Sequence, residues 1–387
     1  MLNYRCPHCS GSLVYDGSSS KLKCQFCESV FTEDELRDTY NNLNNNQNAR
    51  ITDTEANYAQ QRTNVYRCPS CGAEVITDQT TAATHCYYCH SPLVLSEQLL
   101  NEFRPQKIIP FTKNKQQIQN VFVNWAKKFK YLPKDFLSQS VLEKFTTVYV
   151  PCWLADADCE GTVTAVATRT ESHRSGDYII KHTHYYNVVR DGALHYDNVL
   201  HDGSTKINSQ IMESILPYNY NNMVDFSYSY LSGYMADRYD KTKEEVYTIL
   251  KPEIERAAIN SLKSTIVGYN GLINYGIQNA NVQKVNFTYA LLPVWVLTYS
   301  YNNQIYIYTV NDETGKNYGD MPLDGAKLNR TMALSGVAIA IGIYIICRLI
   351  SNSLFDFSLG IIVGVIAFIC YDIYLICSRK KSKGGGR

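Results

Sequence analysis

The sequence predicts a multidomain chain with two small β zinc ribbons at the N-terminus, an α+β middle domain and a transmembrane hairpin of two helices at the C-terminus. Three observations predict this fold class. The first hundred residues carry one four-cysteine pattern twice, the middle mixes amphipathic helices with tyrosine-rich strands, and the end holds two long apolar runs. A length of 387 residues fits two or three domains.

The repeated cysteine pattern predicts two metal sites. Each copy has two C-x-x-C turns, separated by residues 10–23 in the first copy and 72–85 in the second. Four thiolates at such spacing can surround one zinc ion tetrahedrally. Because that shell leaves no open coordination position, both ions would be structural. The eight predicted ligands are Cys6, Cys9, Cys24, Cys27, Cys68, Cys71, Cys86 and Cys89.

A disulfide framework and a redox C-x-x-C motif are the alternatives for these cysteines. The chain has 13 cysteines, an odd number of which eight have metal spacing, and this favours a reducing compartment over disulfides. A redox motif needs a thioredoxin-like βαβ setting, which the sequence does not show. Each unit of roughly thirty residues buries too little core to fold alone, so metal would supply about 10 kcal/mol of folding free energy.

The two ribbons are predicted over residues 1–37 and 65–98, with an Asn-rich linker over 38–64 between them. The linker holds five asparagines in residues 41–46. A polar run of this kind buries too little apolar surface to fold. The ribbons would therefore be separately mobile, or would pack on each other.

Residues 101–325 are predicted to form a soluble α+β domain. Apolar residues recur at helical spacing over 113–130 and 244–266. Pro252 lies inside the second pattern and is expected to kink or divide that helix. The remainder reads as strands, with hairpin turns predicted at residues 190–192 and 302–303.

A weak internal echo links two apolar strands of this domain. Val148–Leu154 and Ala290–Val296 each place a proline two residues before a tryptophan. The echo predicts a duplicated β-unit with helices inserted between the copies. Chance similarity between tyrosine-rich strands is the alternative.

Two apolar runs, residues 332–350 and 354–377, predict a pair of transmembrane helices. Each run is long enough to cross a bilayer core of about 30 Å as a helix. A soluble core hairpin is the alternative, but soluble helices of this length usually carry a polar face. Lysines and arginines in the tail, residues 378–387, predict that both chain ends lie in the cytoplasm.

The sequence shows no set of residues that we expect to be catalytic. His182 and His184 would share one face of a strand, as in a metal pair, but no third ligand has a convincing spacing. Exposed or half-buried strand histidines are the preferred interpretation, and the role of the His173–His201 region stays open. Phosphate-binding, dinucleotide-binding, nucleophile-elbow and metalloprotease motifs are lacking. We therefore predict no enzyme activity and no small-molecule substrate.

Charge disfavours nucleic acid as the partner of the ribbons. The whole chain has a net charge of +1. Residues 1–37 hold four basic and five acidic side chains, and residues 65–98 hold one basic and three acidic. A phosphate-binding face needs a surplus of lysine and arginine. The ribbons therefore read as protein-docking modules.

The order of these parts resembles a known family. Cys-Pro-x-Cys ribbons are followed by the motifs at 148–153 (VYVPCW), 291–295 (LLPVW) and 310–316 (VNDETGK), an apolar hairpin and a basic tail. This order is similar to that of bacterial membrane proteins with a TFIIB-type zinc ribbon, the YdjG-like proteins. Some of them carry the label of primosomal protein or replication factor Y. The resemblance implies a role in membrane stress, with a PspA-like or flotillin-like partner at the bilayer.

Together these observations predict an adaptor anchored in the bacterial cytoplasmic membrane by two spans. Its ribbons would hold two zinc ions and dock protein partners on the cytoplasmic side, in a phage-shock-type membrane-stress module. A membrane-tethered regulator that binds nucleic acid is the alternative, and an enzyme using His182 and His184 is a third hypothesis. The sequence leaves the partner, the stimulus, the oligomeric state and the independence of the two ribbons open.

Overall fold

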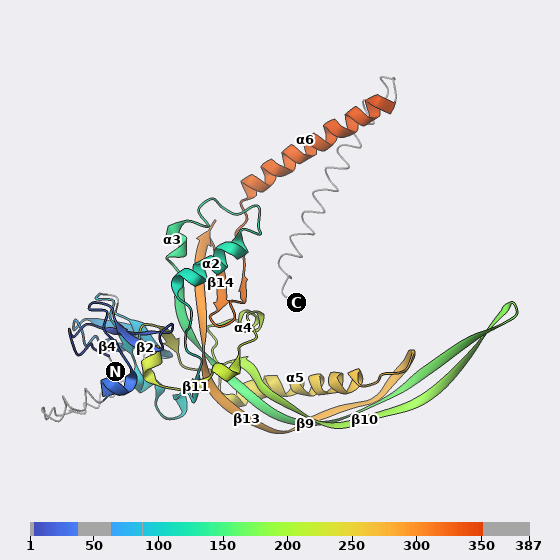
Figure 1. Ribbon diagram of the computed structural model, residues 1–387, viewed down its shortest axis with the longest axis horizontal. Coiled ribbons are helices and arrows are strands. Elements are labelled where there is room, and N and C mark those ends of the chain that lie inside the picture. The colour runs from blue at the N-terminus through green and yellow to red at the C-terminus, as the bar shows by residue number, and fades with distance from the viewer. Residues whose placement is uncertain (1–3, 38–62, 87, 351–387) are drawn as a thin grey trace. The chain divides into compact units, whose positions relative to one another are not determined.

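The structure, a computed structural model, describes residues 4–37, 63–86 and 88–350. The chain divides into two compact units. Unit 1 consists of Met1–Thr112, Thr147–Met212 and Pro217–Val294, and unit 2 of Lys113–Thr146, Glu213–Leu216 and Trp295–Arg387. Figure 1 shows the ribbon of the whole chain.

The strands form sheets of three, ten and two strands. The three-stranded sheet is β1 (Leu13–Asp16), β2 (Lys21–Cys24) and β3 (Val30–Phe31), and the two-stranded sheet is β4 (Thr63–Arg67) and β5 (Glu74–Asp78). The ten-stranded sheet has the order β11-β8-β13-β9-β12-β6-β7, with β10 paired to β9, and β14 paired to β13 and β15. Its strands are β6 (Thr81–His85), β7 (Pro92–Val94), β8 (Lys107–Ile108), β9 (Thr146–Ser175), β10 (Tyr178–Asp202), β11 (Val224–Asp225), β12 (Met235–Asp237), β13 (Gly271–Tyr301), β14 (Gln304–Asn311) and β15 (Asn317–Gly319).

Helices and short 3-10 turns connect these strands. The helices are α2 (Lys115–Ala126), α3 (Gln139–Leu142), α4 (Ser209–Ser214), α5 (Lys243–Ser264) and α6 (Gly325–Ile350). The 3-10 turns are η1 (Ser96–Leu99), η2 (Asn101–Phe103), η3 (Tyr220–Asn222) and η4 (Tyr228–Leu231).

In unit 1, β9 and β10 form one long antiparallel hairpin that turns at residues 176–177, where Gly176 has φ 63°. The prediction of a turn at residues 190–192 is wrong, because Gly192 pairs with Gly161 in the middle of the ladder. A Cβ at Gly161 or Gly192 would lie 3.0 or 3.3 Å from the side chain of Leu262. These glycines therefore make room for a packed helix rather than for a reversal of the chain.

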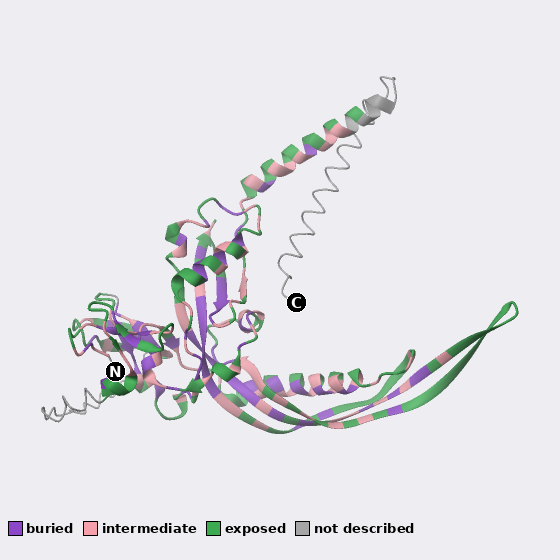
Figure 2. Cartoon of the chain, in the orientation of Figure 1, coloured by how far each residue is buried: buried purple, intermediate pink, exposed green. Residues whose placement is uncertain are grey.

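The helix that packs there is α5, which lies along the strands of unit 1 (Figure 1). Its buried residues recur every four positions, which gives one continuous apolar stripe: Val246, Leu250, Ile254, Ala258 and Leu262. Pro252 lies inside α5 without dividing it, so of the two expected effects, a kink or a division, the division is wrong. Its side chain is exposed. Figure 2 shows the strands buried beneath α5 and exposed toward the tip of the β9–β10 hairpin.

The two strands of the Pro-x-Trp echo take equivalent places in the sheet. Val148 of β9 pairs in parallel with Met235 of β12, and Ala290 of β13 pairs in parallel with Lys107 of β8. In chain order the pattern is β8–α2–β9–β10, with the short α3 between α2 and β9, and then β12–α5–β13–β14. The echo therefore reflects a repeated order of elements rather than chance similarity.

The repeat extends to the helix starts. Asn114 caps α2 and Thr242 caps α5, each in a capping box with the residue three positions later. A lysine precedes each cap: Lys113 donates to the Asp312 carbonyl, and Lys241 pairs with the Asp202 carboxylate, which is 2% exposed. Removal of Lys241 would leave the buried Asp202 carboxylate without its cation, which is destabilising.

Unit 2 has an aromatic core on α2. The ring of Phe122 lies 4.9 Å from Tyr308 and 5.2 Å from Phe136. The hairpin of β13 and β14 turns at Asn302 and Asn303, with φ of 49° and 58°. The turn predicted at residues 302–303 is confirmed, since asparagine tolerates the left-handed region that a two-residue hairpin loop requires.

The predicted transmembrane hairpin, and with it the predicted fold class, needs correction. Among residues 4–37, 63–86 and 88–350, no helix combines the length and apolar character needed to cross a membrane. The first turns of α6, ahead of the predicted span 332–350, carry Lys327 and Arg330. The same finding contradicts the predicted location in the membrane with two spans. The second predicted span, 354–377, and the tail, 378–387, lie outside the described residues, and the middle of the chain is dominated by one large sheet.

The first cysteine region is fixed to the rest of unit 1. The Tyr15 N–H donates to the Ser232 carbonyl at 2.9 Å, and the Ser232 hydroxyl donates to the Leu13 carbonyl at 2.7 Å. Gly233 has φ 91°, and a Cβ there would lie 2.2 Å from Val14 Cγ1. The region therefore docks through close backbone contact. Most of the predicted linker, residues 38–62, lies outside the described residues.

We expect Gly233→Ala to loosen this contact. The added methyl group overlaps Val14 and strains a left-handed backbone, so the free energy of unfolding should fall by about 2 kcal/mol. Urea denaturation and limited proteolysis of residues 4–37 measure the effect. Gly325→Ala is the control, because open space surrounds that position. Equal protease resistance of the two variants would contradict the docking contact.

Candidate metal centres

The structure brings the eight predicted cysteines together in two groups of four. The first group is Cys6, Cys9, Cys24 and Cys27, and the second is Cys68, Cys71, Cys86 and Cys89. Within each group the four sulfur atoms lie within 4.8 Å of one another. Four sulfur donors around one point could hold a metal ion, and His182 and His184 belong to no such group in the described part of the chain.

The sulfur distances exclude disulfides within the groups. The sulfurs of Cys6 and Cys27, and those of Cys9 and Cys24, are 3.5 Å apart. The corresponding distances in the second group are 3.7 Å. A disulfide bond requires about 2.05 Å. All eight side chains are free thiols.

The four C-x-x-C turns share one backbone geometry. In each turn the residue after the second cysteine donates its N–H to the carbonyl of the first cysteine, at distances between 2.8 and 3.2 Å. The donor residues all have φ between 55° and 80°: Ser10, Glu28, Gly72 and His90. The left-handed residue reverses the chain, so both cysteines of a turn face the same point.

Each first cysteine also donates its own N–H across the turn. The Cys6 N–H bonds the Gly11 carbonyl at 2.7 Å, and the Cys68 N–H bonds the Ala73 carbonyl at the same distance. A Cβ at Gly11 would lie 3.3 Å from the sulfurs of Cys9 and Cys24, and 2.5 Å from the Phe26 ring. Glycine at this position therefore leaves room for the sulfur group.

Polar groups favour the thiolate of one cysteine in each group. Although the backbone hydrogen bonds of Gly11 and Ala73 oppose it, the pKa of Cys9 and that of Cys71 are instead raised to about 12, because hydrogen bonds to the neighbouring cysteines and burial together outweigh them. The Ser29 hydroxyl, 3.3 Å from the Cys27 sulfur, is the main cause that lowers the pKa of Cys27 to about 6. In the second group burial opposes ionisation of Cys89, but hydrogen bonds from the Ser91 hydroxyl at 3.3 Å, the Ser91 backbone, Cys71 and Cys68 together bring its pKa again to about 6. Thiolates are the metal-binding form, so both serines support metal binding near neutral pH.

Only one cysteine of each turn is buried. Cys6, Cys24, Cys68 and Cys86 are at most 2% exposed, whereas their partners in the turns are exposed. The buried sulfurs face small cores, built around Leu13 and Leu22 in the first region and around Val75 and Leu93 in the second. A centre with four sulfur ligands has no open position, so this arrangement suits a structural ion rather than a hydrolytic one.

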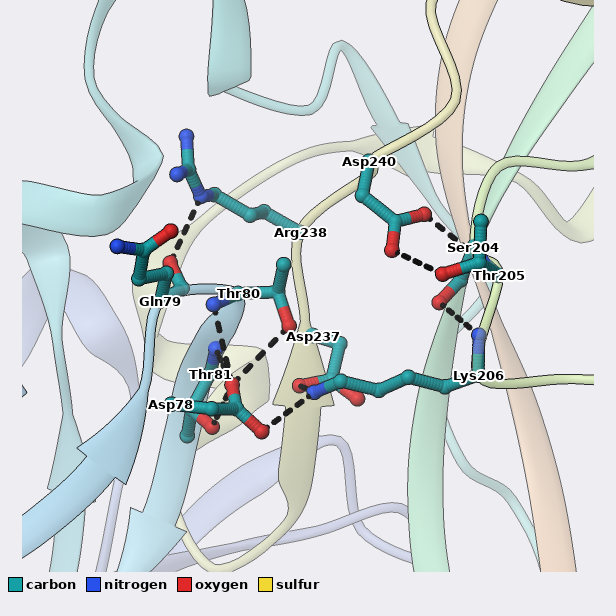
Figure 3. A network of polar contacts seen from close by, with 10 residues as sticks. All are labelled: Asp78, Gln79, Thr80, Thr81, Ser204, Thr205, Lys206, Asp237, Arg238 and Asp240. Atoms are coloured by element: carbon teal, nitrogen blue, oxygen red, sulfur yellow. Dashed lines mark hydrogen bonds and ion pairs between the residues drawn. The ribbon is translucent and has the colours of Figure 1, made fainter. Parts of the chain in front are cut away.

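The second cysteine region is part of the large sheet. Its strand β6 pairs with β12, at Ala83 and Ala236. A polar network at the β5–β6 turn adds to this pairing (Figure 3). There Lys206 bridges two carboxylates, Asp78 at 2.8 Å and Asp237 at 2.9 Å. Although burial opposes it, Lys206 holds the pKa of Asp78 well below its usual value.

The two cysteine regions also contact each other. The Arg5 guanidinium donates to the Pro69 carbonyl at 2.6 Å, and the Ser12 and Ser91 hydroxyls lie 3.3 Å apart. The expectation of separately mobile ribbons is therefore replaced by its alternative, packing of one region on the other.

Comparison with known proteins gives one substantial relative. The chain is 32% identical over 352 residues to "Uncharacterized protein YdjG" of Bacillus subtilis (strain 168), which covers 91% of this chain and 98% of the relative. The chain belongs to the YdjG family. No family model matches the chain, so the TFIIB-type class of its ribbons is not established. No solved structure matches it either.

Two further cysteines and the predicted histidine pair lie apart from the sulfur groups. Cys152 and Cys159 are buried in β9, and burial raises the pKa of both thiols. On the exposed part of the β9–β10 hairpin, the ring of His182 stacks on His173 at 5.3 Å. These positions fit packing and surface roles better than ligation.

Sequence reasoning missed the setting of His195. Its Nδ1 lies 2.6 Å from Asp158 and its Nε2 2.8 Å from Asp197, and these hydrogen bonds raise the pKa of the imidazole. The spacing of His195 and Asp197 on one strand was a visible signal. The Asp158 contact depends on the β9–β10 register, which the sequence does not state.

We expect Ser91→Ala to make the second group lose metal at a higher pH. Without the hydroxyl the thiolate of Cys89 is less favoured, so protons compete with the metal more effectively. The midpoint pH of metal release should therefore rise by about half a pH unit. A colorimetric metal indicator follows release during an acid titration. Ser29→Ala should act likewise on the first group, and Ser172→Ala, on the exposed hairpin, is the control. Unchanged release by both cysteine-region variants would contradict the assigned role of the serines.

Proposed function

We propose that the two cysteine groups hold structural zinc and that this YdjG-family protein is an adaptor that docks a protein partner on its ribbons. The observation that carries the docking proposal is a repeated aromatic. Phe26 and Tyr88 occupy the same position, directly before the last cysteine of each ribbon. Both side chains are largely exposed, Phe26 at 76% and Tyr88 at 72%.

Zinc suits the size of the sulfur groups. Tetrahedral zinc with Zn–S bonds of about 2.3 Å separates its sulfurs by about 3.8 Å. The closest sulfur pairs at 3.5 and 3.7 Å agree with this separation. Four thiolates also favour zinc over magnesium or calcium, which prefer oxygen ligands.

Exposed aromatic side chains on rigid turns are suitable anchors for a protein partner. Protein interfaces are enriched in aromatic residues at their centres. The backbone of each turn is fixed by hydrogen bonds from Glu28 to Cys24 and from His90 to Cys86. A partner would therefore meet two aromatic groups whose backbone does not need to be ordered on binding.

Nucleic acid is the second candidate partner, because exposed aromatic rings also stack on bases. Charge weighs against it. Both ribbon sequences hold more acidic than basic side chains, as the counts for residues 1–37 and 65–98 show. Binding to phosphates needs the opposite balance. We therefore favour a protein, and a PspA-like or flotillin-like protein is the first class to test.

The test is affinity purification with the full chain carrying Phe26→Ala and Tyr88→Ala together. We expect recovery of a stable partner to fall about tenfold or more, since truncation of an aromatic anchor commonly costs 2 kcal/mol or more. Zinc content should stay at two ions per chain. Tyr178→Ala is the matched control, because Tyr178 is 78% exposed on the β9–β10 hairpin.

Two results would contradict the proposal. Equal partner recovery by the wild type and the double variant would remove the docking role of these aromatics. Salt-sensitive retention of DNA or RNA, lost in the double variant, would support the nucleic-acid candidate instead.

A further inference from the structure

The strand β10 leaves one long edge of the sheet in unit 1 open. It pairs with β9 and, in the described ranges, with no other strand. The ladder to β9 runs without a break from Tyr178 to Tyr196. The other side of β10 therefore presents a row of main-chain N–H and carbonyl groups to which a further strand could bind. Natural proteins usually shorten, bend or cover an edge of this kind.

The outer part of the β9–β10 hairpin lacks the support that its inner part receives. The helix α5 ends at Ser264, and β13 begins at Gly271, where a Cβ would lie 2.3 Å from Thr168 Oγ1 of β9. The hairpin continues past both elements as a ribbon of two strands (Figure 1), and every residue from 171 to 187 is exposed. A ribbon of two strands is at best marginally stable in water, whereas a third strand can make it stable.

Apolar side chains of this ribbon point to both of its faces. Ile179 and Tyr185 are 70% and 68% exposed on one face, and Ile180 is 40% exposed on the other. A partner that covers one face would leave the opposite face in water. A strand that adds to the edge of β10 places its own side chains beside both rows, so edge pairing fits this distribution better.

Two charges on β10 indicate which strand adds there. Lys181 and Asp191 are exposed, and neither forms an ion pair within the part of the chain that the structure describes. They lie an even number of positions apart, so both point to the same face of the sheet. Tyr186 lies midway between them. Two copies of β10 that pair antiparallel about Tyr186 therefore bring each lysine opposite the aspartate of the other copy.

We propose that two copies of this chain associate through their β10 edges, antiparallel and with the two-fold axis at Tyr186. Residues 179–185 of each copy would pair with residues 187–193 of the other. That inner stretch is supported by its own chain, since Val188 is 4% exposed and a Cβ at Gly192 would lie 3.3 Å from Leu262 of α5. The bare ribbon of each copy thus gains a third strand from the supported part of the other.

The remaining pairs of this register agree with a symmetric contact. Ile179 comes opposite Ala193, and Thr183 comes opposite Val189, so apolar groups meet across the new edge. His182 comes opposite Arg190, and this pair contributes no attraction. Opposite charges that face each other across strands stabilise the pairing, and like charges destabilise it. The contact is separate from the docking role proposed for the ribbons and does not rest on it.

Analytical ultracentrifugation of the zinc-loaded full chain tests the proposal by charge reversal. We expect the wild type to sediment with the mass of two chains at micromolar concentration. Lys181→Asp and Asp191→Lys each create two contacts between like charges, so each variant alone should have a dissociation constant about tenfold higher. An equimolar mixture of the two variants restores opposite charges and should form mixed dimers as tightly as the wild type. Glu253→Lys, on an exposed position of α5, is the control and should remain dimeric.

Amide hydrogen exchange locates the contact. Residues 179–185 should exchange more slowly in the wild type than in the Lys181→Asp variant, while α5 exchanges equally in both. A wild type that stays monomeric would overturn the proposal and leave the edge to a strand of another protein. A dimer that both charge variants form as tightly as the wild type, or that leaves exchange over residues 179–185 unchanged, would also overturn it, because another surface would then hold the two copies together.

Discussion

A group of four cysteine sulfurs forms only when two separate turns of the chain are held face to face, and this constraint governs the cysteine regions, residues 4–37 and 63–94. The small cores behind the sulfurs, such as Leu13 and Leu22, are too limited to do this alone. The first region gains support from backbone contact with residues 232 and 233. The second gains it from β12, which pairs with β6 on one side and β9 on the other. Metal binding and the large sheet thus stabilise the same segments.

This support changes what the ribbons can do. Independent ribbons on a flexible linker would present their exposed aromatics at varying distances. Here the Arg5–Pro69 and Ser12–Ser91 contacts join the two regions. Phe26 and Tyr88 are therefore carried by two regions that contact each other, so one partner surface can meet both.

Local patterns predicted local structure well. The C-x-x-C spacing identified which cysteines could share a metal, since a turn of this length leaves few other geometries. The Asn302-Asn303 pair indicated its turn, because the residue type matches the required φ. Residues 190–192 look equally turn-like, but there Gly192 opposes Gly161 under Leu262. Some glycines leave room for a packed helix, and others allow the chain to reverse. The sequence alone does not distinguish these two roles, because the position of the helix is known only from the fold.

Predictions from sequence failed for long-range contacts and for the membrane spans. The sequence around Gly233 does not indicate that Val14, more than two hundred residues away, packs against this glycine. Hydropathy indicated two spans, yet no helix in the described ranges meets the requirements of a membrane span. Apolar composition indicates that burial of a segment is favourable. It does not indicate whether the segment is buried in a lipid bilayer or against protein.

The two copies of the duplicated elements share one arrangement but differ in the contacts of their tryptophans. In both copies a tryptophan follows a proline on a long strand, and a lysine precedes a capped helix. The Trp295 indole donates to the Asp312 carboxylate at 2.7 Å, and Asp312 is fully buried in unit 2. In the other copy Trp153 donates to a main-chain carbonyl instead, and Asp202 is left to pair with Lys241. Since Lys241 already pairs with the buried Asp202 carboxylate, with His201 Nδ1 at 3.8 Å from it, this carboxylate does not depend on the Trp153 indole. The remaining surface of the Trp153 ring can therefore line a cleft of unit 1 rather than complete a core.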